Sequence, residues 1–391
     1  MPEIGEETPS PRRWPRAWLA AGAGAVALLG TACDALEGPE NDQNSLRPEG
    51  SAAQTIDNLF NPVFVVSVVV GVFIIAAVVV AAWKFRAKPG TRGDVKQVHG
   101  NTRLEVAWTI IPTLILAVIA VPTVRTIFYL DAQPSDALEI EVIGKQWWWE
   151  FRYPDDKIVT STELIIPVDQ DVRLRLSACD DTLPIGCNVI HSFWVPALAG
   201  KRDVLPGRVN ELTISADDPG TYLSQCAEYC GLSHANMRAR VIALERDDYE
   251  RWVADQQEGP TVPFTDPAPE GEVGPPAGEA QELVSETFSC TNCHVFDSSE
   301  SPSYGPNLTH FAGRTTFAGG TLDLNRENLL EWVLDAPSLV PMESQNCRKT
   351  PPEPGNNCVG MPSFTEDTPE GEPVMTQAQA EVIVDYLLEL R

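Results

Sequence analysis

Val172-Arg173-Leu174-Arg175-Leu176 alternates apolar and charged residues, and Leu138-Glu139-Ile140-Glu141-Val142 does the same earlier in the chain. Side chains along a strand point alternately to its two faces, so each stretch predicts a strand with one buried face. Pro, Gly and Asp separate further stretches of this kind, which is typical of an antiparallel sandwich. We therefore expect an all-β sandwich over residues 131–258, closed by a short helix that carries Tyr249, Trp252 and Val253.

Metal-binding side chains are concentrated in one stretch of this range, Cys226-Ala-Glu228-Tyr-Cys230-Gly-Leu-Ser-His234-Ala-Asn-Met237, and His191 lies upstream. Two thiolates, two imidazoles and a thioether suit copper, because thiolate delocalises copper charge while imidazole and thioether tune its potential. Zinc is an alternative metal, although a structural zinc site needs no methionine and a catalytic zinc site keeps an open position. A disulfide between Cys226 and Cys230 is the other alternative.

Two long apolar runs precede the sandwich. Residues 62–83 contain no charge, and a helix of this length would extend about 33 Å, enough to cross the hydrocarbon core of a bilayer. Residues 106–124 form a second uncharged run, and the chain between the two runs is rich in Lys and Arg. The positive-inside rule places this short loop in the cytoplasm and the rest of the chain outside. We expect a transmembrane hairpin at 62–130, the alternative being a buried hairpin of a soluble protein.

The N-terminus has the pattern of an export signal. Three arginines precede an apolar stretch at 18–29 that is too short to span a bilayer, and Cys33 follows it. Residues 1–32 are predicted to be a signal peptide and Cys33 to be the lipidated residue of a bacterial lipoprotein, with ordinary cleavage after Ala32 as the alternative. Both soluble regions then lie on the extracytoplasmic side of a bacterial cell membrane.

Cysteine number and charge restrict the compartment and the partners. The nine cysteines divide into Cys33 and four pairs, which favours an oxidising compartment. Disulfides are expected for Cys179–Cys187, with two free thiols as the alternative, and for Cys347–Cys358. The formal charge of −27 argues against nucleic acid as a partner, because phosphate binding requires clustered Lys and Arg.

A second external domain follows a linker. Residues 259–278 hold six prolines and four glycines without apolar periodicity, which predicts a semi-rigid tether. Beyond it, Cys290-Thr-Asn-Cys293-His294 has the C-x-x-C-H spacing of c-type haem attachment, in which two thioethers fix the porphyrin and the histidine becomes the proximal iron ligand. A thioredoxin-like redox pair is the alternative, but no βαβ pattern surrounds the motif. We expect an all-α haem domain over residues 279–391.

This domain is similar to the small class I monohaem cytochromes c. The segment Met361-Pro-Ser-Phe364 resembles the one that supplies their axial thioether, which implies Met361 as the distal ligand; Met342 is a rival. His/Met ligation would raise the reduction potential. His310 is expected to be structural. The domain carries a net charge of −13, which suits a partner with a basic face.

The copper motif resembles that of cytochrome c oxidase subunit II, C-x-E-x-C-x-x-x-H-x-x-M, and implies a cupredoxin-like sandwich with a dinuclear copper A centre. In that family the two cysteines bridge both coppers. The resemblance implies that His191 and Met237 complete one copper, and that His234 and the backbone carbonyl of Glu228 complete the other. It also implies a role for the Glu228 carboxylate at a magnesium site shared with subunit I.

Two further segments carry the resemblance in the expected order, His99–Pro112 at the entry of the second membrane helix and Gly144–Glu150 with its three tryptophans. The second implies that Trp147 is an exposed residue through which electrons enter, with core packing as the alternative. Because neighbouring strand residues point to opposite faces, Trp148 is expected on the other side.

These resemblances imply the electron-entry subunit of a caa-type respiratory haem–copper oxidase. A donor such as cytochrome c or a quinol-oxidising complex would reduce haem c, haem c would reduce copper A, and subunit I would reduce dioxygen to water and pump protons. Subunits I and III and the membrane are the implied partners. The alternatives are the copper A subunit of a nitric oxide reductase and a membrane-tethered electron-transfer protein without an attached enzyme.

Overall fold

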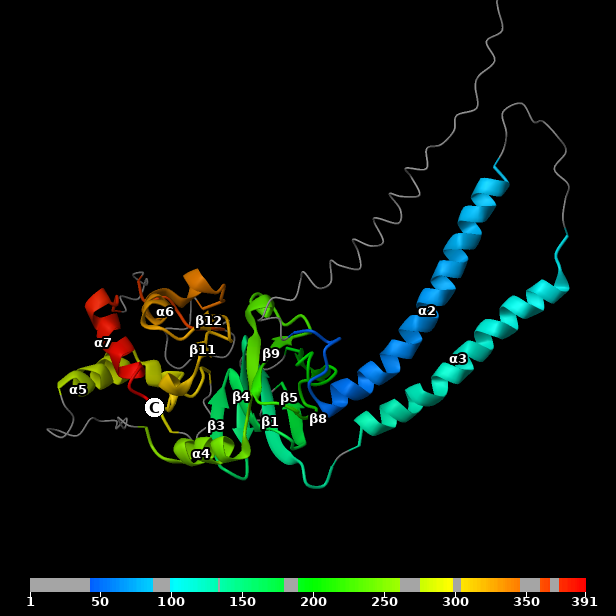
Figure 1. Ribbon diagram of the computed structural model, residues 1–391. Helices are drawn as coiled ribbons and strands as arrows, with labels where there is room; N and C mark the ends of the chain where they lie inside the picture. Colours follow the sequence, from blue (N-terminus) through cyan, green and yellow to red (C-terminus); the bar gives the residue numbers. More distant parts are fainter. Residues whose placement is uncertain are drawn as a thin grey trace, which may run out of the picture. The chain divides into compact units, whose positions relative to one another are not determined.

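The two alternating stretches are neighbouring strands, β1 (Leu138–Lys145) and β5 (Val172–Ser177), of the computed structural model (Figure 1). Leu174 lies in the core, with no exposed surface. On the outer face, Nη1 of Arg175 lies 3.2 Å from a carboxylate oxygen of Glu139 and 3.3 Å from one of Glu141. The charged positions therefore form a cross-strand ladder in solvent, while the apolar positions build the core.

The structure describes residues 43–86, 99–132, 134–178, 189–260, 275–297, 304–344, 359–365 and 373–391. All of them belong to one unit, Gln43–Arg391. The predicted signal peptide, Cys33, both predicted disulfides and most of the predicted linker lie outside the described residues.

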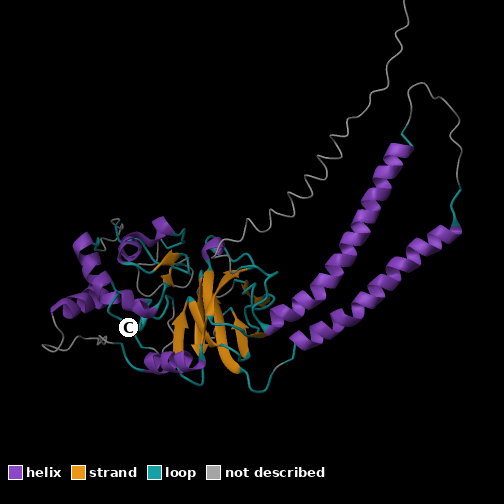
Figure 2. Ribbon diagram, in the orientation of Figure 1, coloured by secondary structure: helices purple, strands orange, loops and turns teal. Residues whose placement is uncertain are grey.

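Two five-stranded sheets form the sandwich, one in the order β3-β2-β1-β5-β8 and the other in the order β4-β10-β9-β6-β7 (Figure 2). Aromatic side chains fill the space between them, and the rings of Trp149 and Phe193 meet edge to face with centroids 5.0 Å apart. The remaining strands are β2 (Trp148–Tyr153), β3 (Ile158–Ser161), β4 (Glu163–Pro167), β6 (His191–Trp194), β7 (Arg202–Val204), β8 (Asn210–Ile214), β9 (Gly220–Cys226) and β10 (Arg238–Leu244).

An antiparallel sandwich was predicted, but the observed sheets contain both parallel and antiparallel pairs. β1 pairs with β5 in parallel, and β4 pairs with β10 in parallel. Alternation reports which face of a strand is buried and carries no information on the direction of its neighbour. Each parallel pair joins strands that are far apart in the chain, which removes the constraint of a hairpin.

The predicted closing helix is α4 (Arg246–Gln257). Tyr249 is buried, and the Trp252 ring lies 5.9 Å from the Tyr249 ring and 5.2 Å from the Tyr153 ring. The helix therefore covers the sandwich through its aromatic side.

Two helices are long and apolar enough to cross a membrane, α2 (Ser51–Lys84) and α3 (Thr102–Leu130). No residue of the most apolar stretch of either helix is buried. The Asn101 side chain caps α3 by accepting hydrogen bonds from the amides of Arg103 and Leu104. Exposed apolar surface of this length requires lipid or another subunit around it.

Helix α2 begins at Ser51, upstream of the predicted start at residue 62, and this extension contacts the sandwich. The Ser51 hydroxyl lies 2.9 Å from the Ser215 hydroxyl, and the Ala53 amide donates to the Leu198 carbonyl at 3.1 Å. Ala52 and Ala53 are buried there. The membrane helix is thus anchored to the sandwich at its first turn.

The C-terminal region forms a second core of mostly helical elements. Helix α7 (Gln377–Leu387), which starts with a capping box of Thr376 and Gln379, buries Ile383 and Tyr386 against α5 and α6. An all-α domain was predicted, but the described part of this region also contains a short two-stranded ribbon. The other elements are α5 (Pro275–Glu282), η3 (Leu283–Thr287), η4 (Cys290–Asn292), η5 (Phe311–Gly313), β11 (Thr316–Phe317), β12 (Leu322–Asp323) and α6 (Arg326–Leu339).

Candidate functional sites

Two thiols and an imidazole converge at one end of the second sheet. His191, Cys226 and Cys230 are buried, and their ligand atoms lie within 4.8 Å of one another. The Cys226 Sγ lies 3.9 Å from His191 Nδ1, and the Cys230 Sγ lies 3.5 Å from His234 Nδ1. The Met237 Sδ, fully buried, lies 3.7 Å from the Cys230 Sγ. All five predicted ligand side chains therefore meet in one group.

Short strands and one 3-10 turn hold this group. Cys226 ends β9 and His191 begins β6, while His234 begins η2 (His234–Asn236). A Cβ atom at position 144 would lie 2.9 Å from His191 Cδ2, so Gly144 leaves room for the imidazole. The Trp149 ring packs edge-on against His191 at 5.8 Å. The imidazole is thus oriented by its packing before any metal binds.

The two thiols titrate as a pair. Hydrogen bonding to Cys230 lowers the pKa of Cys226, while the same bond and burial raise the pKa of Cys230. The contact between the two sulfurs therefore favours one thiolate that shares the proton of one thiol. A cation bound to both sulfurs would displace that proton, because thiolate is the ligand form of cysteine.

The donor set fits copper better than the alternatives. Cys226 and Cys230 are free, with sulfurs 3.8 Å apart, whereas a disulfide bond is roughly 2.05 Å long, so they are not joined. A thioether beside two thiolates and two imidazoles is the combination that copper sites use and that zinc sites do not need.

Glu228 contributes to the group through its backbone. Its carbonyl oxygen lies 3.2 Å from the Cys226 sulfur, whereas its carboxylate accepts a hydrogen bond from the Tyr229 amide at 3.1 Å. The carbonyl is therefore placed as a possible copper ligand, and the carboxylate stays at the surface of the loop.

Trp147 is buried, contrary to the expectation of an exposed indole. It is 8% exposed, and its Nε1 donates to the Cys230 carbonyl at 3.1 Å. A Cβ atom at position 319 would lie 2.8 Å from the Trp147 carbonyl oxygen, so the C-terminal region covers this residue. The sequence motif could not reveal the cover, because Gly319 is distant in the chain. Trp148 lies outside the sandwich core that holds Trp147 and Trp149, as predicted.

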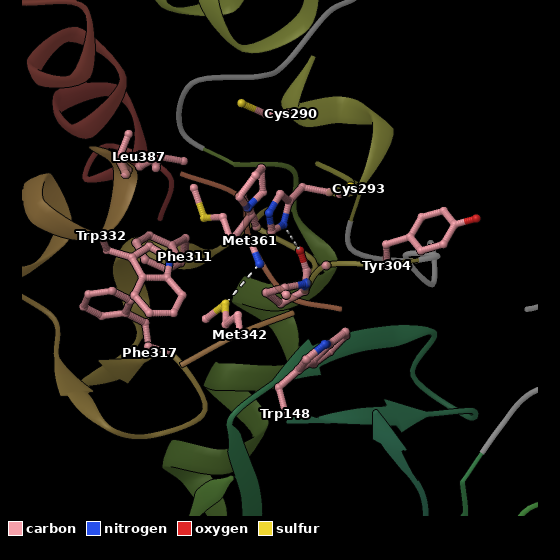
Figure 3. Close-up of a pocket in the computed structure, with 18 of the residues that line it drawn as sticks. Trp148, Cys290, Cys293, Tyr304, Phe311, Phe317, Trp332, Met342, Met361 and Leu387 are labelled. Atoms are coloured by element: carbon pink, nitrogen blue, oxygen red, sulfur yellow. Dashed lines mark hydrogen bonds between the residues drawn. The ribbon is translucent and has the colours of Figure 1, made fainter. Parts of the chain in front are cut away.

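The C-x-x-C-H motif lines a mostly apolar pocket of the C-terminal region (Figure 3). Nδ1 of His294 lies 2.8 Å from the Pro306 carbonyl oxygen, which makes Nδ1 the donor and leaves Nε2 free to bind a metal. A Cβ atom at position 305 would lie 2.5 Å from His294 Cε1, so only glycine fits there. Burial raises the pKa of Cys290 to about 12 and that of Cys293 to about 11, which keeps both thiols neutral.

Both candidate distal ligands lie at this pocket. The Met361 amide donates to the Met342 sulfur at 3.2 Å, a contact drawn in Figure 3. Gly360, at φ +105°, has no room for a Cβ atom, which would lie 2.5 Å from that sulfur. Because the Met342 sulfur already accepts a hydrogen bond, the Met361 thioether is the more available ligand.

Most of the remaining lining is apolar or aromatic and includes Phe288, Phe311, Phe317, Trp332 and Leu387, while Lys145 and Arg314 are its charged members. His310 is not part of it, because its Nε2 contacts the Glu258 carbonyl at 3.1 Å.

Part of the pocket wall comes from the sandwich, which the sequence did not predict. Trp148 points toward the pocket in Figure 3, and the Lys145 Nζ lies 4.9 Å from the centre of its ring. Glu150, fully buried, holds Lys145 and Arg152 with contacts of 2.6 Å each. These residues precede the C-x-x-C-H motif by more than a hundred positions, so no local pattern connects them with it.

The family models that match this chain cover its membrane helices and its sandwich. The family described as "Cytochrome C oxidase subunit II, periplasmic domain" matches residues 138–244, and its "transmembrane domain" counterpart matches residues 41–126. "Cytochrome c oxidase subunit 2" of Alkalihalophilus pseudofirmus is 38% identical over 308 residues, 77% of this chain and 84% of the relative. Its counterpart in Bacillus sp. (strain PS3) is 32% identical, covering 78% of this chain and 80% of the relative. The family models end at residue 244, and residues 1–244 make up less than two thirds of the chain. Both relatives match more than three quarters of the chain, so both matches include residues after 244.

Among solved structures, the periplasmic domain of subunit II of cytochrome oxidase from Bradyrhizobium japonicum is 30% identical. The match covers 31% of this chain and 94% of that domain, with a TM-score of 0.28.

Proposed function

The chain belongs to the cytochrome c oxidase subunit II family and is part of an oxidoreductase complex, and from this premise we propose a two-centre electron path through it. A donor such as cytochrome c or a quinol-oxidising complex reduces a haem c on the C-terminal domain. The electron passes to copper A on the sandwich and then to subunit I, which reduces dioxygen to water and pumps protons.

The sandwich residues prepare the copper site. A dinuclear copper centre supplies one-electron transfer with little rearrangement of its ligands. Cys226 and Cys230 would hold it together with His191, His234, Met237 and the Glu228 carbonyl. The five side chains already lie close together, four of them buried, so they require little movement on metal binding. We propose that the Glu228 carboxylate takes part in a magnesium site shared with subunit I. This carboxylate accepts a hydrogen bond from the Tyr229 amide.

The C-terminal residues prepare the haem site. A covalent haem c supplies a second one-electron centre. Cys290 and Cys293 would carry the thioether links, and His294 would bind iron through the Nε2 that its hydrogen bond to Pro306 leaves free. Met361 would complete the axial pair, which raises the potential into the range of an oxidase donor.

The group of two thiols, two imidazoles and one thioether, buried except for the partly exposed His234, is the observation that carries this proposal. The two apolar helices support a membrane location, and the positive loop supports placement of both soluble domains outside a bacterial cell. Subunits I and III would then contact the helices within the bilayer.

Purification of the intact complex in mild detergent tests the proposal. We expect two coppers and one covalent haem per chain, with haem a in the accompanying subunit and a near-infrared copper A band. Haem b as the only other haem would favour a nitric oxide reductase. An isolated chain with no further haem would favour a tethered electron carrier, and a preparation without copper would overturn the assignment.

A further inference from the structure

A short ribbon of the C-terminal domain docks on the sandwich. We call residues 315–323, which include β11 and β12, the docking ribbon. The amides of Thr315 and Thr316 both donate to one carboxylate oxygen of Glu163 at 2.9 Å, and their two hydroxyls contact the same oxygen. Glu163 begins β4 and is only 5% exposed. One sandwich carboxylate therefore satisfies four donors of the other domain.

The side chain of one arginine extends this contact. Arg240 pairs with Glu163 in the sheet register, and its guanidinium lies 3.3 Å from the Asp323 carboxylate and 3.2 Å from the Thr315 hydroxyl. A carboxylate and a guanidinium side by side thus bind the two ends of the docking ribbon. Charge-assisted hydrogen bonds of this kind are stronger than neutral ones, most of all when shielded from water.

The middle of the docking ribbon contacts the loop that carries the metal ligands. The Arg238 amide donates to the Gly319 carbonyl at 2.8 Å, and the Thr321 hydroxyl donates to the Asn236 carbonyl at 3.0 Å. These two partners flank Met237. Gly319 has φ +66°, and a Cβ atom there would lie 2.8 Å from both the Asn236 and the Trp147 carbonyl oxygens. Only glycine allows so close an approach.

We propose that Glu163 is a positioning residue that clamps the docking ribbon to the sandwich and seats the C-terminal domain permanently over Trp147, as a fixed internal donor instead of one that swings on its linker. The proposal rests on the function proposed above. Arg240 and Gly319 complete the clamp. In this arrangement the pocket wall at Trp148 and the metal-binding loop belong to one docked assembly, and an external redox protein meets the C-terminal domain instead of Trp147.

Hydrogen–deuterium exchange of the intact complex, followed by mass spectrometry, tests the clamp without relying on turnover. In the parent protein, peptides covering 315–323 and 236–240 should be protected. Glu163→Ala leaves four donors without their acceptor, and Gly319→Ala blocks the approach from the other side. Each substitution should raise exchange of both peptides at least tenfold. Glu250→Gln, an exposed acid on α4, is the matched control and should leave exchange unchanged.

Copper content and the haem spectrum of the same samples separate the two proposals. Loss of protection with both cofactors retained supports the clamp. Exchange at the parent rate in both variants, or unprotected peptides in the parent, overturns it whatever the cofactor content. A parent protein without copper or covalent haem sinks the proposed function instead, while its exchange pattern still reports on the docking.

Discussion

Met361 and Met342 show how one residue can be chosen between two chemically equal candidates. Both sulfurs lie at the pocket proposed to hold haem c, but the Met342 sulfur accepts the Met361 amide hydrogen bond. Met361→Leu should therefore remove the axial thioether and lower the haem potential, by part of the roughly 0.8 V range that axial ligands span. Redox titration of the haem band measures the change. Met342→Leu should shift the potential far less, and the reverse order would make Met342 the ligand.

His310 should make the C-terminal domain sensitive to acid. Burial lowers the pKa of His310, although hydrogen bonds to the backbone oppose the shift. The unfolded chain therefore takes up the proton first, and the free energy of unfolding should fall as pH drops below about 6.5, the ordinary histidine value. Each unit of difference between the folded and unfolded pKa corresponds to about 1.4 kcal/mol.

Thermal unfolding of the detergent-solubilised chain at several pH values measures this slope. His310→Gln keeps a donor for the Glu258 carbonyl and cannot be protonated, so its stability should vary less between pH 7 and pH 5. An equal slope in both proteins would assign the acid sensitivity to other groups.

The sequence predicted the members of both candidate sites because thiols, imidazoles and thioethers at fixed spacing have few other uses. It favoured an exposed Trp147, whereas the ring packs in the sandwich core and donates to the Cys230 carbonyl, which is the alternative of core packing. It also gave no sign of Glu163, because a strand-end carboxylate is chemically ordinary until the fold brings Thr315 and Thr316 to it.

At the scale of elements, the buried and the exposed face of β5 should contribute differently to the free energy of unfolding. Leu174 has no exposed surface, whereas the Arg175 side chain is 38% exposed beside its acidic partners. Leu174→Ala should cost about 2–5 kcal/mol of unfolding free energy, because it leaves a cavity in the core. Arg175→Ala should cost less than about 1 kcal/mol. Denaturant unfolding of the sandwich, followed by tryptophan fluorescence, compares them, and equal losses would contradict the assignment of faces.

The periodicity of apolar residues predicted where these elements lie in the chain, but it did not predict which segments they pair with or in which direction. It located β1, β5 and both membrane helices, since each needs one apolar face or a fully apolar run. It did not locate the first turns of α2, where small residues pack on the sandwich, or the parallel direction of β1 and β5. Those features depend on contacts between distant segments, which no local pattern records.

At the scale of the molecule, the order of electron flow is open to a direct test. Cys226→Ser should eliminate copper binding while leaving the covalent haem in place, because the two sites have separate cores. The haem should then be reduced by the donor and remain reduced in air. Visible spectra during turnover, with metal analysis, measure this. Reoxidation of the haem at the parent rate would mean that electrons bypass the sandwich, and Glu250→Gln serves as the control.

The close contact of Gly319 with the Trp147 backbone, which fixes the C-terminal domain on the sandwich, should affect the kinetics of electron transfer. A donor bound in place is present at an effective concentration that no dilution changes, so its reaction with the acceptor is first order. Added salt screens the encounter of free proteins, yet it has little access to a carboxylate as buried as Glu163. The oxidase would then keep a constant internal rate as its surroundings change, and only the outermost step, from the soluble pool to the haem, would respond to ionic strength.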